Sequence, residues 1–490
     1  MMPQQPAMPS LGLSLVPVVA LILLLAADVI AFGEDSSYGA NQIAMLLAAF
    51  IAGGIGMARG IRWKAISEAI AHSVSQTTEA ILILLMIGAL SGTWLIAGII
   101  PAFIHYGLQI LEPGIFLFAA CIICGLLSLA TGSSWGTVGT VGVALVGIGS
   151  ALGLSEGWIA GAIISGAYFG DKMSPLSDTT NIAAAVGGTD LFSHIRYMTL
   201  TTVPSLVIAL IVFLIVGFGG AAAADGDSAA FADEFGAAVF AAFNIHVGLF
   251  IAPVVVIVLI ARKVPAAAAL LIGTLLGALT AVIFQPDIIR EVAGVGNEAG
   301  GFALAAFKAS IQSMALDSAI TTSNAMANDL LTSSGMAGML NTVWLILCAM
   351  VFGATMQATR MLERITQAIL SGVQSTFGLV GRTVGTCLAF NVLASDQYLA
   401  IVVPGNMLKD AYAERDLAPE NLSRTLEDSG TVTSVLIPWN TCGVAQSGIL
   451  GVATWAYLPY CIFNWMSPLM TLTVAAVGFR IKRLSDVKAN

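Results

Sequence analysis

The chain has 490 residues, of which 58% are hydrophobic and only 10% are charged. A soluble domain has about 25% charged residues, so this composition leaves too little polar surface to face water and excludes an ordinary soluble protein. Apolar segments of membrane-spanning length recur along the chain and predict an all-α, polytopic membrane protein with the lipid bilayer as a partner. The net charge is −9 and no basic stretch of the nucleic-acid-binding type occurs, so we expect no nucleic acid partner.

In chain order, the apolar segments predict full membrane-spanning helices at 11–32, 37–58, 78–100, 198–218, 241–261, 265–284, 339–358 and 455–479. The first is interpreted as a helix rather than a signal peptide, because no Lys or Arg precedes it and acidic residues follow it. Four other apolar stretches are interrupted by glycine and polar residues. They predict broken helices and re-entrant hairpins at 113–152, 157–190, 379–407 and 423–452.

The charges of the loops predict the orientation. Lys and Arg gather at 59–64, at Arg196, at 262–263 and at 480–488, whereas the acidic segments 33–40 and 219–238 contain neither. Lys and Arg near helix ends mark the cytoplasmic side of a membrane. Both termini are therefore predicted to lie in the cytoplasm, with the acidic segments outside, and we expect the bacterial inner membrane as the location.

The two halves show the same order of parts in opposite predicted orientation: a two-helix unit, an irregular region and one closing helix. In a weak sequence echo, Gly170–Ser174 lines up with Gly430–Ser434 at an offset of 260 residues. These observations predict two inverted-topology repeats, 1–218 and 241–490, joined by an external acidic linker, 219–240, with a cytoplasmic tail at the end. Inverted repeats are typical of secondary transporters, because they support alternating access.

Residues 165–188 place Asp171, Lys172 and Asp178 within an apolar segment. One charge near the centre of a bilayer costs about 2.5–3.5 kcal/mol, so these residues need a partner or a function. Pro175 frees carbonyls of the preceding turn. Carbonyl, hydroxyl and carboxylate oxygens together suit a hard cation such as Na⁺. A water-exposed cytoplasmic loop is the alternative interpretation, but apolar helix flanks the segment closely on both sides.

The stretch 423–446 repeats this pattern in the second half, with polar residues that interrupt an apolar helix. Around its predicted break lie Pro438, Asn440 and Thr441. Arg424 and Asp428 precede the break at a helical spacing of four, which predicts an ion pair. Structural and functional roles for that pair remain equally open.

Two further polar interruptions, 131–137 and 391–397, are predicted tips of re-entrant hairpins. Small hydroxyl residues such as Ser133 and Ser395 let the backbone approach a ligand closely. Asp396 is the one charged residue of an otherwise uncharged stretch, which makes it a candidate functional residue. It also fits the N-cap of a half-helix, and the two interpretations are compatible.

The stretch Gly170–Asn181 closely resembles the signature of the NhaC family of Na⁺/H⁺ antiporters, in the ion transporter superfamily. Leu436–Gly443 is similar to that family's second broken helix, and the resemblance in layout extends over nearly the whole chain. It implies paired re-entrant hairpins and two broken helices that meet at the membrane midplane. The binding positions it implies are Asp171, Ser174, Asp178, Thr179, Thr180, Asn181, Asp396, Asn440 and Thr441. The supporting positions are Lys172, Pro175, Pro438, Ser133, Ser395 and Asp428.

These residues and the resemblance predict a secondary antiporter that exchanges Na⁺ for H⁺ at one shared site. Burial favours the protonated form of a carboxyl group, whereas an arriving Na⁺ favours the ionised form, so each ligand displaces the other. We expect Asp171 and Asp178 to take the Na⁺, with Lys172 paired to one of them when the ion is absent.

The same family includes exchangers of organic acids such as malate and lactate, so a cation-coupled organic acid exchanger or symporter is the alternative. Such a substrate needs cationic side chains or helix N-termini, and only Lys172 and Arg424 are obvious side-chain candidates. The chain contains neither H-E-x-x-H nor G-x-S-x-G, and we expect no enzymatic activity and no cofactor. A homodimer is left open as the assembly.

Overall fold

The computed structural model describes residues 8–32, 39–220, 237–262, 264–294, 301–322, 324, 328, 330–370 and 375–485. Most of the predicted acidic turn and of the predicted acidic linker lies outside these residues. So do Lys263 and Lys488, two of the basic residues used to predict the orientation. The boundaries of the two repeats around the linker therefore stay a prediction.

The first half is helical from its first described turn. Its elements are α1 (Leu11–Phe32), α2 (Ala40–Ala58), α3 (Trp63–Gln76), α4 (Thr78–Ile96), α5 (Ile99–Ile110), α6 (Pro113–Thr131), α7 (Ser134–Thr137), η2 (Val138–Gly142), α8 (Val143–Ala151), α9 (Glu156–Met173), α10 (Asp178–Gly187) and α11 (Leu191–Phe218). Helices α7, η2 and α8 follow one another without a break and form one apolar helix of 18 residues.

The second half repeats this order of elements with insertions. Its elements are η3 (Val247–Phe250), α13 (Ile251–Ala261), α14 (Ala266–Phe284), α15 (Pro286–Ala293), α16 (Gly301–Ala315), β1 (Ser318–Ala319), β2 (Thr332–Ser333), α18 (Gly335–Ala358), α19 (Met361–Leu370), α20 (Thr376–Leu393), α21 (Gln397–Ala413), α22 (Pro419–Leu426), η4 (Glu427–Thr431), η5 (Ser434–Leu436), α23 (Thr441–Leu450), α24 (Thr454–Tyr457), η6 (Leu458–Tyr460) and α25 (Ile462–Val477). The two-residue strands pair antiparallel and are the only sheet in the described part of an otherwise helical protein.

Within the described residues, nine helices are long and apolar enough to cross a membrane, or ten if a bent pair near the C-terminus counts as one span. The polytopic helical prediction is confirmed. Two predicted spans differ from the structure. The span predicted at 241–261 is shorter, because its first residues do not continue the helix: the backbone N–H and C=O of Asn244 bond instead to the side chain of Gln285, at 2.9 and 3.0 Å.

The other difference is the closing helix, predicted as one continuous span at 455–479. It consists of two helical pieces, Thr454–Tyr460 and Ile462–Val477, which meet at an angle of 53°. The break falls at Cys461, which has a non-helical ψ of 64°, and Pro459 two residues before it removes a backbone donor from the preceding piece. A sequence window of uniform apolarity does not detect such a bend.

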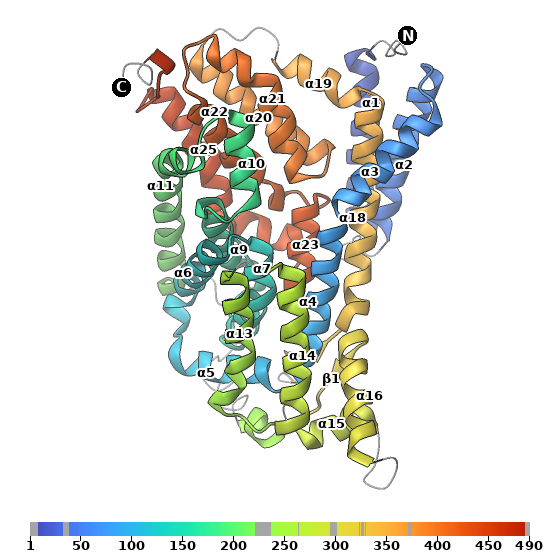
Figure 1. Ribbon diagram of the computed structural model, residues 1–490, viewed down its shortest axis with the longest axis vertical. Coiled ribbons are helices and arrows are strands. Elements are labelled where there is room, and N and C mark those ends of the chain that lie inside the picture. Colours follow the sequence, from blue (N-terminus) through green and yellow to red (C-terminus); the bar gives the residue numbers. More distant parts are fainter. Residues whose placement is uncertain are drawn as a thin grey trace.

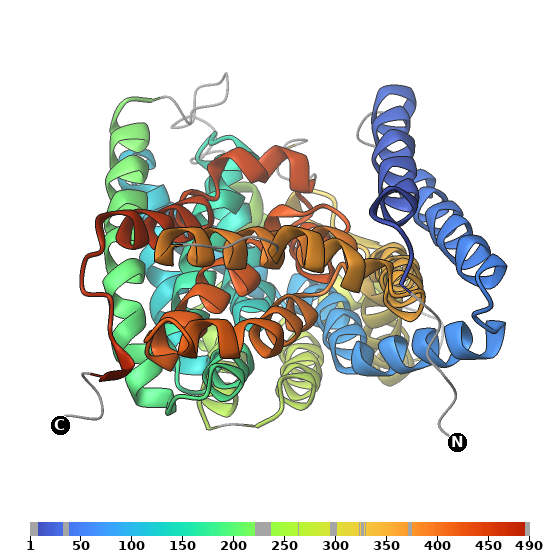
Figure 2. The ribbon, with the colours of Figure 1, turned by 90° about the horizontal axis from the view of Figure 1, so that it is seen from above.

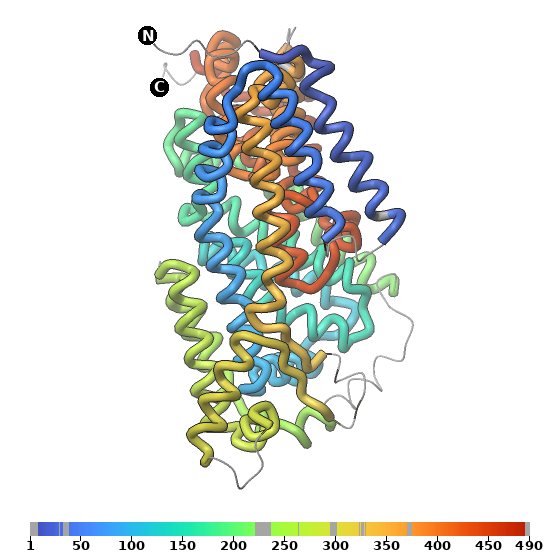
Figure 3. The backbone as a smooth tube through the Cα atoms, turned by 90° about the vertical axis from the view of Figure 1, so that its right-hand side faces the viewer, coloured from blue at the N-terminus to red at the C-terminus, as the bar shows by residue number. Residues whose placement is uncertain are grey.

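The two halves interlock (Figure 1). The hairpin α1–α2 of the first half packs on α18 of the second, and the hairpin α13–α14 of the second half packs on α4 of the first. Helices α4 and α18 also contact each other. Figure 3 shows the two hairpins at opposite ends of the long axis, and Figure 2 shows α1 and α2 at one side of the bundle, with α11 at the other.

The centre of the molecule contains the hairpins α6–α7 and α20–α21 and the broken helices α9–α10 and α22–α23. Helices α6 and α9 approach closely because glycines face the contact: a Cβ on Gly166 would lie 2.1 Å from the carbonyl oxygen of Cys121. Helix α10 packs on α21 and α22, and α23 packs on α18 and η2. The second piece of the first broken helix thus lies against the second half, and that of the second broken helix contacts η2 of the first half as well as α18 of its own half, which brings the breaks together.

Candidate functional site

A cavity of about 360 Å³ lies at the junction of the four chain breaks. The hairpin tips contribute Gly132 to Trp135 and Asp396 to Tyr398, and the broken helices contribute Asp171, Leu176, Asp178 and Thr441. The rest of the wall comes from the α3–α4 junction, including Gln76 and Glu79, and from Ala266 at the start of α14. The predicted convergence of hairpins and broken helices is therefore present around one cavity.

Four helices begin at these breaks, and each has a side-chain cap of the type preferred at an N-terminus. The caps are Ser133 for α7, Ser177 for α10, Asp396 for α21 and Asn440 for α23. Each accepts a hydrogen bond from a backbone N–H two or three residues later. The polar residues that interrupt the apolar sequence thus start the second piece of each helix pair.

Asp171 ends α9 and is buried, with 7% of its surface exposed. Its Oδ2 accepts hydrogen bonds from the backbone N–H of Ser134 at 3.1 Å and from the Ser134 hydroxyl at 2.7 Å. Its other oxygen, Oδ1, has no hydrogen-bond partner among the described residues. One oxygen is therefore fixed by the hairpin tip of the same half, and the other is available to a ligand.

Asp178 starts α10 and bridges the two halves. Its Oδ1 accepts the N–H of Thr179 at 2.9 Å, and its Oδ2 accepts the phenol hydroxyl of Tyr398 at 2.5 Å. Tyr398 lies in the first turn of α21, so this bond joins the broken helix of the first half to the hairpin of the second. Seven positions separate Asp171 from Asp178, and the break at Pro175 leaves both on the wall of the same cavity.

The second half adds Asp396 and Thr441 to the wall. Asp396 Oδ1 accepts the N–H of Leu399 at 2.9 Å, which is the N-cap predicted as one of its roles. Ser395 before it has a φ of 58°, a backbone conformation that is uncommon outside glycine. In this conformation its carbonyl accepts the N–H of Thr441 at 3.0 Å, which ties the hairpin tip to the broken helix.

Five predicted binding positions do not line the cavity, namely Ser174, Thr179, Thr180, Asn181 and Asn440. They hold the breaks in place instead. The Thr180 hydroxyl donates to the carbonyl of Lys172 at 3.0 Å, and Asn181 Nδ2 donates to the carbonyl of Ser177 at 2.6 Å. Short polar residues at a break satisfy free backbone groups as readily as they bind ions, and the sequence does not distinguish these uses.

Asn440 illustrates the same point in the second half. Besides capping α23, its Nδ2 donates to the carbonyl of Asn391 at 3.1 Å. Asn391 in turn donates to the carbonyl of Gly430 at 2.7 Å. The amide pair therefore joins the hairpin α20–α21 to both pieces of the broken helix. Pro438, a predicted supporting residue, lies in the non-helical link between η5 and α23.

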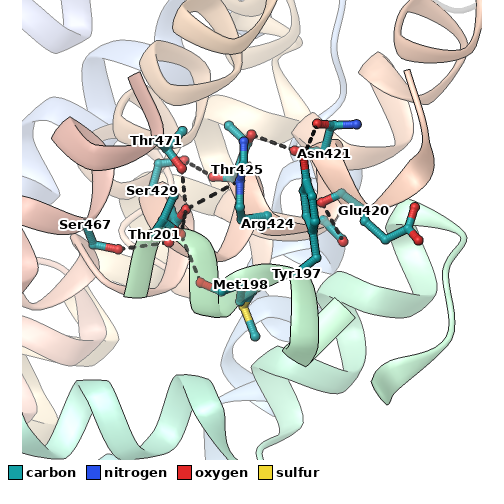
Figure 4. A network of polar contacts seen from close by, with 12 residues as sticks. Tyr197, Met198, Thr201, Glu420, Asn421, Arg424, Thr425, Ser429, Ser467 and Thr471 are labelled. Carbon is teal, nitrogen blue, oxygen red and sulfur yellow. Dashed lines mark hydrogen bonds and ion pairs between the residues drawn. The ribbon is translucent and has the colours of Figure 1, made fainter. Parts of the chain in front are cut away.

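Lys172 points away from the cavity into a second buried polar cluster, so its predicted pairing with Asp171 or Asp178 is wrong for this conformation. Its ammonium group pairs with Asp428, and both side chains have no exposed surface. Three hydroxyl groups from two other helices also donate to Asp428, those of Thr201, Ser467 and Thr471. Figure 4 shows these hydroxyl residues gathered from separate helices.

Arg424 completes this cluster. Its Nε lies 4.0 Å from Asp428 Oδ2, in agreement with the predicted pair at a spacing of four. Its guanidinium carbon lies 4.7 Å from the centre of the Tyr197 ring, a cation–π contact that compensates part of the charge (Figure 4). Lys172 and Asp428 come from different halves, so the cluster fixes the relative position of the two broken helices.

Three residues of the site were not predicted, namely Ser134, Tyr398 and Glu427. Ser134 lies within the predicted hairpin tip and Tyr398 directly follows it, but nothing in the sequence indicates their partners. Glu427 is fully buried, and its Oε1 accepts the hydroxyl of Thr179 at 3.0 Å. It lies beside Asp428 and three residues after Arg424, so the isolation that identified Asp396 did not single it out in the sequence.

Four carboxyl groups line the cavity, from Glu79, Asp171, Asp178 and Asp396, and no Lys, Arg or His is among the described residues of its wall. Helix N-termini favour anions, and four of them meet here. Three of the carboxylates already accept N–H groups from these N-termini. Three of the four positive helix ends are thus used by the protein's own carboxylates, and the neutral amide of Asn440 caps the fourth, which leaves a cavity suited to cations.

Comparison with known proteins gives the family. The model of the Na⁺/H⁺ antiporter family matches residues 166–479. The chain is 34% identical to the Na⁺/H⁺ antiporter NhaC of Alkalihalophilus pseudofirmus, with 90% of this chain and 91% of that protein covered. It is 38% identical to the malate-2H⁺/Na⁺-lactate antiporter of Bacillus subtilis, with 87% and 86% covered. It is 32% identical to the arginine/ornithine antiporter ArcD of Halobacterium salinarum, with 96% and 93% covered.

The match includes both broken helices, the second hairpin and the bent closing helix. It agrees with the resemblance that the residues 170–181 carry, and with a fold built around broken helices in an apolar helical bundle. The chain is a multi-pass membrane protein and belongs to the Na⁺/H⁺ antiporter family.

Proposed function

We propose that the protein is a secondary active antiporter that exchanges Na⁺ for H⁺ across the bacterial inner membrane by alternating access. The observation that carries this proposal is the cavity at the four chain breaks, whose wall holds four carboxyl groups and no basic side chain among the described residues. Oxygen ligands of this kind suit a hard cation, and a buried carboxyl group binds a proton when the cation is absent.

Asp171 and Asp178 are the proposed exchange residues. In each, one oxygen is held by a backbone or hydroxyl donor of its own half. The other oxygen of Asp171 has no hydrogen-bond partner among the described residues. The other oxygen of Asp178 accepts the phenol hydroxyl of Tyr398. Na⁺ and a proton compete for these oxygens because either one neutralises a carboxylate in a poorly solvated site. Asp396 and Thr441 supply further oxygen atoms from the second half.

Exchange of organic acids is the second candidate, favoured by the similarity to the malate/lactate antiporter. A carboxylate substrate needs cationic side chains or helix N-termini, and three of the four N-termini at the cavity already bind carboxylates of the protein. Lys172 and Arg424 were its best candidates in the sequence, but both lie in the buried cluster around Asp428 and neither lines the cavity. The cation therefore remains the better-supported substrate.

The test is exchange in proteoliposomes that contain the purified protein and a pH-sensitive dye. An inward Na⁺ gradient is expected to drive proton efflux, and Asp171→Asn and Asp178→Asn are expected to abolish it. Matched vesicles receive radiolabelled malate, lactate or arginine in place of the Na⁺ gradient. Gradient-driven uptake of one of these without any Na⁺-driven proton movement would replace the proposal with organic solute exchange.

The location and orientation are part of the proposal. Basic residues follow two of the helices: Arg59 and Arg62 follow α2, and Arg262 follows α13. The other ends of these two helices lead toward the acidic segments. The positive-inside rule places such basic loops in the cytoplasm. Both termini are then cytoplasmic, and we propose that the cavity, which the starts of α4 and α14 border, is reached from the cytoplasm in this conformation. We expect no cofactor and no enzymatic activity, with the bilayer and small cations as partners and a homodimer open as the assembly.

A further inference from the structure

A row of buried hydroxyl groups leads from the cavity to a carboxyl group that the exchange mechanism does not use. The Ser177 hydroxyl lies near the carboxylate of Asp171, whose Oδ1 has no hydrogen-bond partner among the described residues in this conformation, and 3.1 Å from the hydroxyl of Thr179. The Thr179 hydroxyl lies 3.0 Å from Oε1 of Glu427. All four side chains are buried, and the row passes from α9 and α10 in the first half to η4 in the second.

Glu427 differs from its neighbour Asp428 in its surroundings. Asp428 has an ammonium partner and three hydroxyl donors, whereas Glu427 makes no ion pair within 4.0 Å and its Oε2 has no hydrogen-bond partner among the described residues. A buried carboxylate without compensation is costly and a neutral carboxylic acid is not. The environment of Glu427 therefore favours its protonated form, so a proton that reaches this carboxylate is bound.

The charged and titratable groups around Glu427 come from several elements. They are Asp171 and Lys172 on α9, Cys387 on α20, Arg424 on α22 and Asp428 beside it on η4. Lys172 and Arg424 are directed to Asp428, so they set the electrostatic potential at Glu427 without occupying its oxygens. The hydroxyl of Thr431 on η4 is likewise buried without a partner and lies next to Glu427.

From this geometry we propose that Glu427 is a separate proton-binding site, connected to the cation site through the hydroxyls of Ser177 and Thr179. The inference rests on the proposed Na⁺/H⁺ exchange. When Na⁺ binds Asp171, its proton passes to Ser177, the Ser177 proton passes to Thr179, and the Thr179 proton passes to Glu427. Each hydroxyl gives up one proton and receives one, so the only net change is a proton moved from Asp171 to Glu427.

The row is suited to this transfer because each hydroxyl both donates and accepts. Two arrangements are available, one with the proton on Asp171 and one with it on Glu427, and they differ only in the direction in which the hydroxyls point. The proton is then bound at Glu427, while Na⁺ occupies the cavity. The two ions therefore compete at Asp171 but are bound at different residues once they have exchanged.

The experiment separates proton-coupled from cation-only exchange in proteoliposomes. Glu427→Gln and Thr179→Val are each compared with wild type for Na⁺-driven proton movement and for ²²Na⁺/Na⁺ exchange at equal pH, which needs no net proton transfer. We expect both variants to lose at least tenfold in proton movement and to keep cation exchange within threefold of wild type. Thr179→Ser, which restores the hydroxyl, is expected to recover proton movement.

Matched controls are Glu420→Gln and Thr425→Val, on the same helix as Glu427 but off the row. The Thr425 hydroxyl donates to the carbonyl of Asn421 in its own helix at 2.7 Å. Wild-type proton movement in Glu427→Gln or Thr179→Val, or an equal loss of both exchanges, overturns the proton site while leaving Na⁺/H⁺ exchange intact. Absence of Na⁺-driven proton movement in wild type overturns the proposed function itself. If Glu427→Gln does not reach the membrane, the two Thr179 variants decide.

Discussion

The ion pair between Lys172 and Asp428 gives the sharpest prediction about stability, because neither side chain has any exposed surface. Removal of one member of a buried pair leaves an uncompensated charge and costs about 3–5 kcal/mol. We expect this full cost for Asp428→Asn, since Lys172 and Arg424 then share no carboxylate. Lys172→Met should cost less, about 1.5–3 kcal/mol, the range for one hydrogen bond to a charged group. Asp428 retains three hydroxyl donors and Arg424 in that variant.

The double variant Lys172→Met/Asp428→Asn is expected to be more stable than the sum of the single changes predicts, with a coupling energy of about 2 kcal/mol. The measurement is unfolding of the purified protein in mixed micelles with increasing SDS, followed by circular dichroism. Glu68→Gln is the control, since its pair with Lys64 is exposed and 3.8 Å long, and no change is expected. Additivity of the two single changes within about 0.5 kcal/mol would refute the assignment of the pair as the link between the halves.

Three further predictions concern the cavity, all measured as the dependence of proteoliposome exchange on Na⁺ concentration. Ser134→Ala removes a 2.7 Å hydrogen bond to ionised Asp171, so protons then compete better with Na⁺ for this carboxylate. The half-saturating Na⁺ concentration should rise about tenfold, which is equivalent to about 1.4 kcal/mol. Tyr398→Phe removes the hydrogen bond to Asp178 Oδ2 and should also raise the half-saturating Na⁺ concentration; an unchanged value would contradict a role of Asp178 in cation binding. Gly132→Ala should abolish exchange, because a Cβ at this position would lie 2.6 Å from the Leu176 backbone. Gly451→Ala is the control: Gly451 has a similar positive φ but open space around it, so exchange should continue.

The breaks of the helices were predictable because their causes are local. Pro175 removes a donor, Gly132 adopts a positive φ and Asp396 caps the next helix, and each property belongs to the residue itself. The same local signals placed the cavity carboxylates Asp171 and Asp178. Polar residues in an apolar segment are few, so candidate site residues are easier to identify from this sequence than from that of a soluble protein.

The partners were not predictable, because they depend on distant parts of the chain. Lys172 was expected to pair with a neighbouring aspartate, but its partner lies 256 residues away. Thr179 was expected to face the ion, yet its hydroxyl bonds to Glu427 across the interface between the halves, 248 residues away. A spacing rule reports which side chains share a helix face, whereas the packing of two helices decides which face meets the cavity.

The two halves repeat their elements but not their charges, and this difference has a mechanistic consequence. With the offset of 260 residues, Asp171 corresponds to Thr431, so the second broken helix has no carboxylate at that position. The second half supplies Asp396 from its hairpin instead, where the first half has small uncharged residues. Apart from Glu79 on α4, carboxylates therefore reach the cavity from the broken helix of one half and from the hairpin of the other. Any movement of one half relative to the other must change the distance between these carboxylates, and with it the relative affinity for one Na⁺ or for separate protons.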